Sequence, residues 1–170
     1  NAIGLQNPGV ERVVRDILPT LDFAETRFFA NACGSTIEEY VEVVRRFDDS
    51  PIDAIEINIS CPNVKQGGMA FGGDPRMTHA VVAAVRAATR LPVIPKLSPN
   101  VADITVFARA AEEAGADALS CINTLLGLAI DVEARRPRLG FGTGGLSGPA
   151  IRPVAVRMAW QAARAVRIPV

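Results

Sequence analysis

The sequence predicts an α/β fold, and more narrowly a partial (β/α)8 TIM barrel, from three features of the chain. Short apolar segments alternate with segments of helical periodicity along the 170 residues. The apolar segments carry few polar residues, which is typical of parallel strands that are buried on both faces. Distinctive polar residues follow several of these segments directly, and the catalytic face of a barrel is built at the same ends of its strands.

Apolar runs and turn residues predict the strands and helices in order. Strands are expected at 26–33, 54–57, 92–97 and 116–122, and residues 168–170 read as the opening of another. Helices are expected at 10–18, 35–47, 75–90, 101–114 and 149–166. A capping box at Ser35-Thr36-Ile37-Glu38 begins the second helix, and Asp74 followed by Pro75 begins the third. Residues 64–74 and 123–148 are predicted to be loops.

The placement of polar residues favours a barrel over an open doubly wound sheet. The glycine-rich dinucleotide motif of such a sheet does not follow the first strand. Polar residues instead mark four successive strand ends: Asn31 and Gly34, Asn58 and Cys61, Lys96 and Ser98, and Asn123 and Thr124. We expect residues 1–170 to form a single domain. Because a complete barrel takes about 250 residues, that domain would be roughly the central half or more of a barrel, truncated at both ends.

Composition and charge argue against several classes of function. The 18 basic residues balance the 18 acidic ones, so neither nucleic acid nor an anionic membrane surface is an expected partner. We expect no membrane span, since no apolar run approaches about 20 residues, and no signal peptide, since the chain opens on Asn1-Ala2-Ile3-Gly4-Leu5. Three widely spaced cysteines favour a cytoplasmic location, and with His79 as the single histidine we expect no metal site.

The segment Asn58-Ile59-Ser60-Cys61-Pro62-Asn63 is the strongest candidate for chemistry. Pro62 lacks a backbone N–H and should end the preceding strand, which leaves Cys61 at the strand end between two asparagines. A thiol there suits proton transfer beside a polar, planar substrate. The alternative is a small buried cysteine in a turn; Cys33 and Cys121 are interpreted as core residues.

Five motifs together resemble one enzyme family. They are Asn1-Ala2-Ile3-Gly4-Leu5 with Asn7-Pro8-Gly9, the 58–63 segment, Lys96-Leu97-Ser98-Pro99-Asn100, Ile122-Asn123-Thr124-Leu125-Leu126-Gly127, and Gly144-Gly145-Leu146-Ser147-Gly148-Pro149. In order and spacing they resemble dihydroorotate dehydrogenase, and more narrowly the catalytic subunit of the class 1B, NAD-linked type. Class 2 enzymes carry serine at the position of Cys61. The pyrimidine-reducing domain of dihydropyrimidine dehydrogenase differs at Asn63 and at residues 125–127.

The resemblance implies FMN-dependent oxidation of (S)-dihydroorotate to orotate in de novo pyrimidine (UMP) biosynthesis. Cys61 matches the family's general base, which takes the C5 proton while a hydride leaves C6 for the flavin. Substrate-binding positions match Asn1, Ala2, Ile3, Gly4, Leu5, Asn58, Asn63, Asn123 and Thr124. FMN-binding positions match Asn31, Asn58, Lys96, Ile122 and Gly148, with Lys96 beside the N1–O2 edge of the flavin.

The same resemblance implies partners. We expect a homodimer joined to an electron-transfer subunit as a heterotetramer, with FAD and a [2Fe-2S] cluster on that second subunit and NAD⁺ as the acceptor. An early lysine and late glycine-rich strand ends of the family's site would lie outside residues 1–170. We therefore expect the isolated chain to be inactive and to bind FMN weakly.

Two alternatives remain open at the level of sequence. A flavin-dependent reductase like dihydropyrimidine dehydrogenase would share Cys61 and Lys96 but present a different substrate edge. A partial barrel without catalytic function would only pack against partners. The many polar residues at strand ends count against that second alternative.

Overall fold

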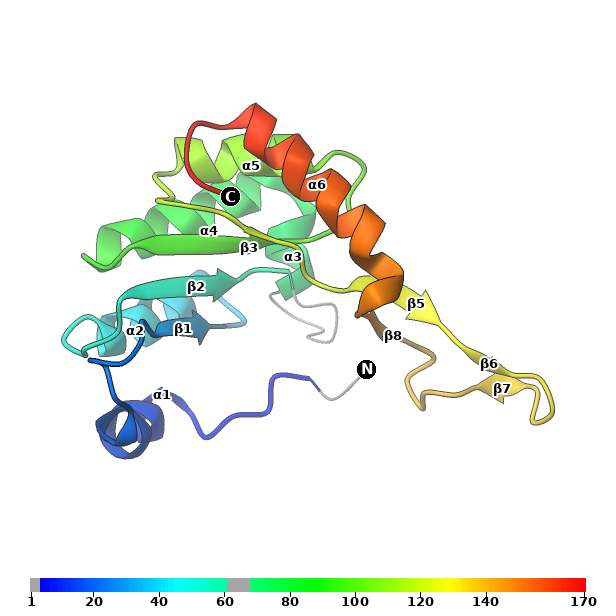
Figure 1. The fold of residues 1–170 in the computed structure, drawn as a ribbon, viewed down its shortest axis with the longest axis horizontal. Helices are drawn as coiled ribbons and strands as arrows, with labels where there is room; N and C mark the ends of the chain where they lie inside the picture. The colour runs from blue at the N-terminus through cyan, green and yellow to red at the C-terminus, as the bar shows by residue number, and fades with distance from the viewer. Residues whose placement is uncertain (1–3, 61–67) are drawn as a thin grey trace.

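Four parallel strands, hydrogen-bonded in chain order, form the main sheet (Figure 1). The computed structural model describes residues 4–60 and 68–170. The strands are β1 (Phe29–Ala32), β2 (Ala54–Asn58), β3 (Val93–Leu97) and β4 (Ser120–Cys121). An open doubly wound sheet would reverse its strand order at a switch point, whereas sequential order is that of a barrel wall. The fold is a partial (β/α)8 barrel, as the sequence predicts.

Helices connect the strands and follow the last one. α2 (Ile37–Phe47) lies between β1 and β2, α3 (Gly68–Gly73) and α4 (Pro75–Ala88) between β2 and β3, and α5 (Ile104–Glu113) between β3 and β4. α6 (Arg152–Ala165) follows β4 after a 3-10 turn, η3 (Pro149–Ile151). Before β1, the chain forms α1 (Val10–Arg12), a π-helical turn η1 (Val13–Ile17) and a 3-10 turn η2 (Leu18–Thr20). Every predicted helix is confirmed, with bounds shifted by a few residues, although the helix predicted at 10–18 is mostly π-helical and 3-10. The prediction of a loop at 64–74 was wrong for residues 68–73, which form α3.

The N-terminus of α2 differs by one residue from the predicted capping box. The N-cap is Thr36, whose Oγ1 accepts from the backbone N–H of Glu39 at 3.2 Å. Glu39 in turn accepts from the backbone N–H of Ser35 at 2.6 Å. The prediction of Ser35 as the cap was therefore wrong by one position, because both Ser35 and Thr36 can cap. α4 begins as predicted, with Asp74 as N-cap and Pro75 next.

One face of the sheet packs against the helices and forms the core. Ile55, Ile57 and Val93 are fully buried there, together with Val44 of α2 and Val85 of α4. Alternating strand residues face this layer because successive side chains point to opposite sides. Burying each such side chain contributes about 1.5–3 kcal/mol, so this layer stabilises the strand positions.

The opposite face, called the inner face below, carries the polar residues. Sheet register places Asn31 of β1 beside Glu56 of β2, and Lys96 of β3 beside Asn58. Phe29, on the same face as Asn31, is 60% exposed. The inner face is thus accessible to solvent at the start of β1.

Pro95 lies inside the central strand β3, where a proline is unusual. The carbonyl groups of Val93 and Leu97 accept from the backbone N–H groups of Asp117 and Asn123, so this side of β3 faces β4. By the alternation of a parallel ladder, Pro95 faces the same way. It cannot donate to β4, whose paired stretch begins only at Ser120.

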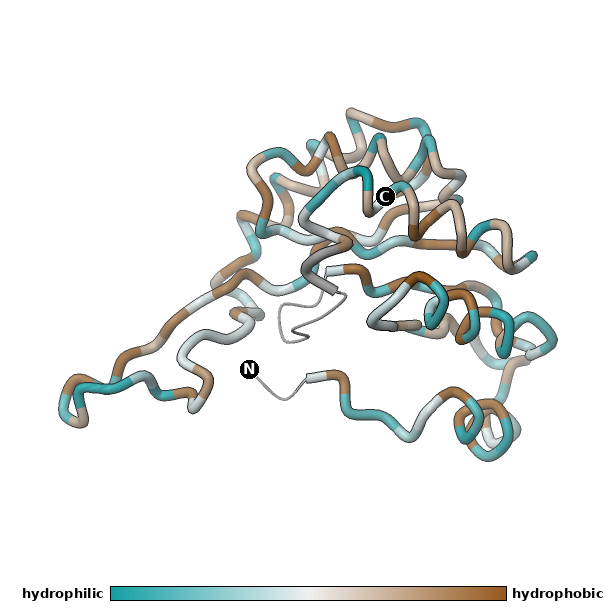
Figure 2. Tube along the Cα trace, turned by 180° about the vertical axis from the view of Figure 1, so that it is seen from behind, coloured by the Kyte–Doolittle hydropathy of each residue, from teal (hydrophilic) through white to brown (hydrophobic). Residues whose placement is uncertain are grey.

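Residues 123–148 are not the loop that the sequence predicts; this prediction was wrong. They contain two antiparallel pairs, β5 (Leu125–Leu128) with β8 (Thr143–Leu146) and β6 (Ile130–Asp131) with β7 (Arg136–Pro137). The pairs form an arm that extends away from the sheet (Figure 1). Figure 2 shows the outgoing β5 as hydrophobic and much of the returning segment around β7 as hydrophilic.

The chain leaves α6 along the free edge of β4. The backbone N–H of Leu119 donates to the carbonyl of Pro169 at 2.8 Å. This bond places Pro169 beside Leu119, but residues 168–170 form no strand, so the predicted strand opening stays a prediction. None of the helices in the described ranges 4–60 and 68–170 is long and apolar enough to span a bilayer.

Candidate active site

Three polar side chains from three neighbouring strands meet on the inner face; we call them the lysine group. Asn31 Nδ2 donates to Glu56 Oε1 at 2.5 Å, and Lys96 Nζ lies 3.3 Å from the same oxygen. The parallel register of β1, β2 and β3 brings them together. The side chains of Glu56 and Lys96 are 22% and 29% exposed, so both remain accessible to a ligand. The group pairs one positive with one negative charge.

Asn58, Ser60 and Asn123 form a second cluster, the asparagine group. Asn123 Nδ2 donates to Asn58 Oδ1 at 3.1 Å and to Ser60 Oγ at 2.9 Å. Ser60 Oγ donates to the backbone carbonyl of Lys96 at 2.9 Å, which ties this group to β3. The amide NH₂ of Asn58 has no partner among the described residues, so it is the group's available donor.

The Asn58 end of β2 is anchored from the helix side as well. The buried Tyr40 of α2 donates through its hydroxyl to the Asn58 carbonyl at 2.6 Å. Its ring meets that of Phe71 edge-on, with centroids 5.7 Å apart. A buried, hydrogen-bonded tyrosine fixes the backbone that carries the polar groups.

Thr124 contacts its neighbour Asn123 and two segments that are distant in sequence, one at Asn100 and one at Gly145 of β8. Asn123 Oδ1 accepts from the Thr124 N–H at 2.8 Å, and Asn100 Nδ2 donates to the Thr124 carbonyl at 3.0 Å. Asn100 Oδ1 also accepts from the N–H of Leu126, so Asn100 fixes the start of the arm. On its other side, Thr124 contacts Gly145 of β8 so closely that a Cβ there would lie 2.5 Å from Thr124 Oγ1.

The segment before α1 lies beside β1. Gly4 and Leu5 line a groove of about 380 Å³ together with Asn31 and Cys33. The structure therefore brings Gly4 and Leu5, two of the predicted substrate positions, near one member of the lysine group. Asn7 fixes this segment locally, because its Nδ2 donates to the Leu5 carbonyl at 2.7 Å.

Two predicted cofactor positions have other surroundings. Ile122 is half-buried and packs against the core. Gly148 adopts φ 84° and leads into η3, and no hydrogen bond among the described residues joins it to Lys96 or Asn31. Their roles toward a cofactor remain predictions.

The predicted base Cys61, and with it Asn63 and residues Asn1, Ala2 and Ile3, lie outside the described residues. Of the other cysteines, Cys121 packs against the core, and burial raises the pKa of its thiol to about 11. Cys33 is half-buried at the groove beside Gly4 rather than in the core. The described residues contain no cluster of His, Cys, Asp or Glu that could hold a metal ion.

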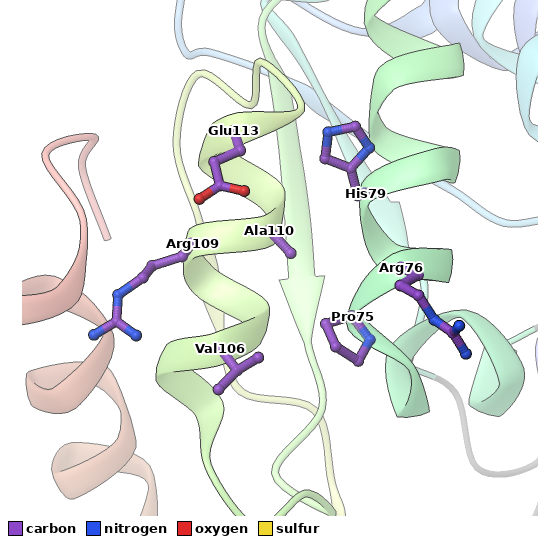
Figure 3. A pocket seen from close by; sticks show the side chains of 7 residues that line it. All are labelled: Pro75, Arg76, His79, Val106, Arg109, Ala110 and Glu113. Carbon is purple, nitrogen blue, oxygen red and sulfur yellow. The ribbon is translucent and has the colours of Figure 1, made fainter.

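A groove of about 470 Å³ between α4 and α5 lies apart from these polar groups. It is lined by Pro75, Arg76, His79, Val106, Arg109, Ala110 and Glu113. Figure 3 shows Arg76 and Arg109 extending to opposite sides, so the two guanidinium groups do not converge on one point. The helix layer faces the sheet side opposite to the inner face, and we assign no chemistry to this groove.

Sequence reasoning missed Glu56, Ser60 and Asn100 as members of the site. The signal for Glu56 was a lone carboxylate inside the apolar run 54–57, since charges are rare in buried strands. Ser60 and Asn100 lie within the motifs at 58–63 and 96–100, but short polar residues at strand ends are also common turn formers.

The arrangement places an ammonium and several amides at the carboxyl ends of successive strands. Such donors suit a planar ring with alternating carbonyl and N–H groups. The sequence model of dihydroorotate dehydrogenase matches residues 1–170, which is the whole chain. The chain belongs to the dihydroorotate dehydrogenase family. Its parallel β/α wall and polar strand ends are therefore part of that family's barrel.

Curated dihydroorotate dehydrogenases resemble this chain over nearly its whole length. The catalytic subunit of dihydroorotate dehydrogenase B (NAD(+)) from Desulforudis audaxviator is 61% identical over 99% of this chain and 55% of its own length. The corresponding subunit from Pelobacter propionicus is 56% identical, over 99% of this chain and 56% of its own length. The chain thus spans about half the length of these relatives.

A solved structure supports the fold. Ligand-free dihydroorotate dehydrogenase from Eimeria tenella superposes with a TM-score of 0.60 at 22% identity, covering 76% of this chain and 41% of that one. At this identity the likeness supports the partial barrel and not the details of the site.

Proposed function

We propose that this chain supplies the substrate face of an FMN-dependent dihydroorotate dehydrogenase, which oxidises (S)-dihydroorotate to orotate in pyrimidine biosynthesis. The observation that carries the proposal is the meeting of Asn31, Lys96, Asn58 and Asn123 at one end of the sheet. This meeting occurs in a chain whose full length matches the family. We also propose that residues 1–170 act as one domain of a longer barrel.

The lysine group fits FMN by the chemistry of its donors. Lys96 offers a half-exposed ammonium and Asn31 an amide, both on the inner face. Bound FMN would supply the two-electron acceptor for the reaction. An ammonium at the flavin's N1–O2 edge favours the extra negative charge of reduction, because opposite charges attract strongly in a half-buried site. Ile122 and Gly148 are further proposed contacts to FMN.

The asparagine group fits the pyrimidine substrate. The amide NH₂ of Asn58, which has no partner among residues 4–60 and 68–170, can donate to a ring carbonyl or to the carboxylate. Both polar atoms of Asn123 already form hydrogen bonds, and one of these bonds holds Asn58 in place. Asn123 can therefore contact substrate only if it shares one of these hydrogen bonds with the substrate or gives one up. Thr124 and the segment from Asn1 to Leu5, together with Asn63, are the remaining proposed substrate contacts.

Cys61 is the proposed general base. It follows Ser60 directly, and Ser60 is bonded to both Asn123 and the Lys96 backbone. A thiolate at this position would remove the C5 proton of dihydroorotate. For this step Cys61 must be deprotonated. Either the site lowers the pKa of its thiol, or the binding of substrate favours the thiolate.

The names of the curated relatives, which are catalytic subunits of dihydroorotate dehydrogenase B (NAD(+)), support further proposals about assembly. We propose a cytoplasmic homodimer joined to an electron-transfer subunit that carries FAD and a [2Fe-2S] cluster and passes electrons to NAD⁺. Both curated relatives are described as NAD(+) catalytic subunits. By itself, the 170-residue chain is proposed to be inactive.

The test uses a completed protein, in which this chain is joined to the remaining segments of the 61% identical Desulforudis audaxviator relative. We expect it to purify with FMN. Anaerobic addition of dihydroorotate should bleach the flavin absorbance and release one orotate per flavin. Dihydrouracil, which lacks the carboxylate, should bleach it far more slowly, because buried amides left unpaired cost about 1–3 kcal/mol each.

Equal rates with the two substrates would support a reductase like dihydropyrimidine dehydrogenase instead. A completed protein that retains no flavin would contradict both enzymatic assignments and support a partial barrel without catalytic function.

A further inference from the structure

Glu56 is a carboxylate in the middle of the apolar strand β2. Its neighbours Ile55 and Ile57 are fully buried on the helix side, whereas Glu56 projects onto the inner face. A charged side chain in such a strand costs stability unless it is paired. Its position therefore calls for a specific role of the charge.

The same oxygen of Glu56 serves both other members of the lysine group. Oε1 accepts from Asn31 Nδ2 at 2.5 Å and lies 3.3 Å from Lys96 Nζ. Among the described residues, Lys96 forms its ion pair with Glu56 alone. One carboxylate thus sets the positions of an amide and an ammonium that come from different strands.

We propose that Glu56 is a positioning residue for the flavin site, acting through Lys96 and Asn31 rather than by touching substrate. This inference rests on the proposed function, in which Lys96 and Asn31 face FMN. Glu56 has two effects there. It fixes the direction of both donors, and its negative charge offsets part of the charge that Lys96 presents to the flavin.

The two effects predict different behaviour for two variants of the completed protein. Glu56→Gln keeps an oxygen acceptor of the same length but removes the charge. The midpoint potential of bound FMN should then shift to a more positive value, because reduction adds negative charge beside an ammonium that is no longer offset. FMN affinity should stay within about threefold of the unsubstituted protein, less than the loss of one hydrogen bond.

Glu56→Ala removes both the charge and the shared acceptor. The potential should again shift to a more positive value, and FMN should dissociate about tenfold more readily, the usual size for one lost hydrogen bond. The midpoint potential is measured by equilibrium titration with a redox dye, and FMN dissociation by the fluorescence of released FMN. Neither measurement depends on turnover.

Asp53→Asn is the matched control. Asp53 precedes the same strand and pairs with Arg27 at 2.8 Å, away from the lysine group. Its substitution should lower thermal stability and leave the FMN potential unchanged. A purely structural Glu56 would behave in the same way, so an unchanged potential in both Glu56 variants overturns the proposal.

Lys96→Ala separates this inference from the function on which it rests. If Lys96 faces FMN, its loss should lower the potential, opposite in sign to the effect of Glu56→Gln. A lowered potential in Lys96→Ala with no shift in Glu56→Gln rejects the role of Glu56 alone. No shift in Lys96→Ala rejects the placement of FMN beside the lysine group.

Discussion

Among single residues, Cys121 shows how the environment of a thiol decides its chemistry. Cys121 pairs with Leu97 in the β3–β4 register and packs against the core on the helix side. Burial raises the pKa of its thiol from 9.0 to about 11. Since the thiolate is the reactive form, this cysteine stays protonated and unreactive at neutral pH.

We predict that Cys121 resists alkylation in the folded protein. Incubating the completed protein with iodoacetamide at about pH 8, below the raised pKa, should leave Cys121 unmodified, whereas unfolding in urea should make it reactive. Peptide mass spectrometry measures both. Because the folded pKa is raised, the thiol contributes stability below the unfolded pKa of 9.0 and loses it as pH rises toward about 11. Rapid labelling in the folded state would contradict the buried position.

Sequence alone predicts the polar residues at strand ends better than the contacts between them. Lys96, Asn31 and Asn58 are identified because polar residues that end apolar strands are conspicuous. Glu56 was missed because its partners come from β1 and β3, and sheet register cannot be read from a single strand. The two hydrogen bonds that Asn123 Nδ2 donates were missed for the same reason, because their acceptors, Asn58 and Ser60, are distant in sequence.

Between elements, the arm is coupled to the site through Thr124. Its strand β8 places Gly145 against Thr124, and Asn100 bonds both Thr124 and Leu126. A change in the arm should therefore reach the asparagine group without touching it.

We predict that Gly145→Ala disturbs substrate binding. The added Cβ would lie 2.5 Å from Thr124 Oγ1 and must displace it. Overpacking of this kind costs about 1–3 kcal/mol, so orotate affinity should fall about tenfold or more while FMN is retained. Orotate titration monitored by flavin absorbance measures the change. Gly140→Ala is the control in the same arm, because its Cβ meets nothing within 4 Å. Equal orotate affinity in both variants would show that Thr124 does not contact the substrate site.

The arm itself was beyond sequence reasoning. Its strands are short, and residues 139–145 are rich in glycine, which is typical of loops. By contrast, α2 and α4 were predicted with nearly correct bounds, because their caps and apolar periodicity agree.

At the scale of the whole molecule, carboxylates join consecutive β/α units. Asp48, which follows α2, accepts from Thr89 Oγ1 at 2.6 Å and from the Arg90 N–H at 2.8 Å, before β3. The hydrogen bond from Thr89, followed by that from the Arg90 N–H, lowers the pKa of Asp48 below 3.8. The stability that it contributes is present above pH 3.8 and is lost as pH falls through the lowered value.

We predict that Asp48→Asn weakens the acid sensitivity of the fold. In the completed protein, the urea midpoint should fall as pH decreases from about 4 to about 2, and this fall should be shallower in Asp48→Asn. Asp49→Asn is the control, because the Asp49 side chain is 98% exposed and lies 3.9 Å from Arg90. An identical pH dependence in all three proteins would contradict the role of Asp48.

The barrel class was predictable as a whole because it follows from strand–helix alternation and from polar residues at successive strand ends. The register of the strands was not predictable, since it depends on contacts between residues far apart in sequence. The same residues that made the fold recognisable also carry the proposed chemistry.

The central proposal is that Cys61 removes the C5 proton of dihydroorotate while the hydride from C6 passes to FMN. Its most direct test is the anaerobic rate of flavin bleaching by dihydroorotate in Cys61→Ala and Cys121→Ala versions of the completed protein. Both should retain FMN, since neither thiol belongs to the lysine group. Cys61→Ala should bleach about 10²–10⁴-fold more slowly, the usual loss for a general base, while Cys121→Ala keeps the unsubstituted rate. An unchanged rate in Cys61→Ala would contradict the mechanism.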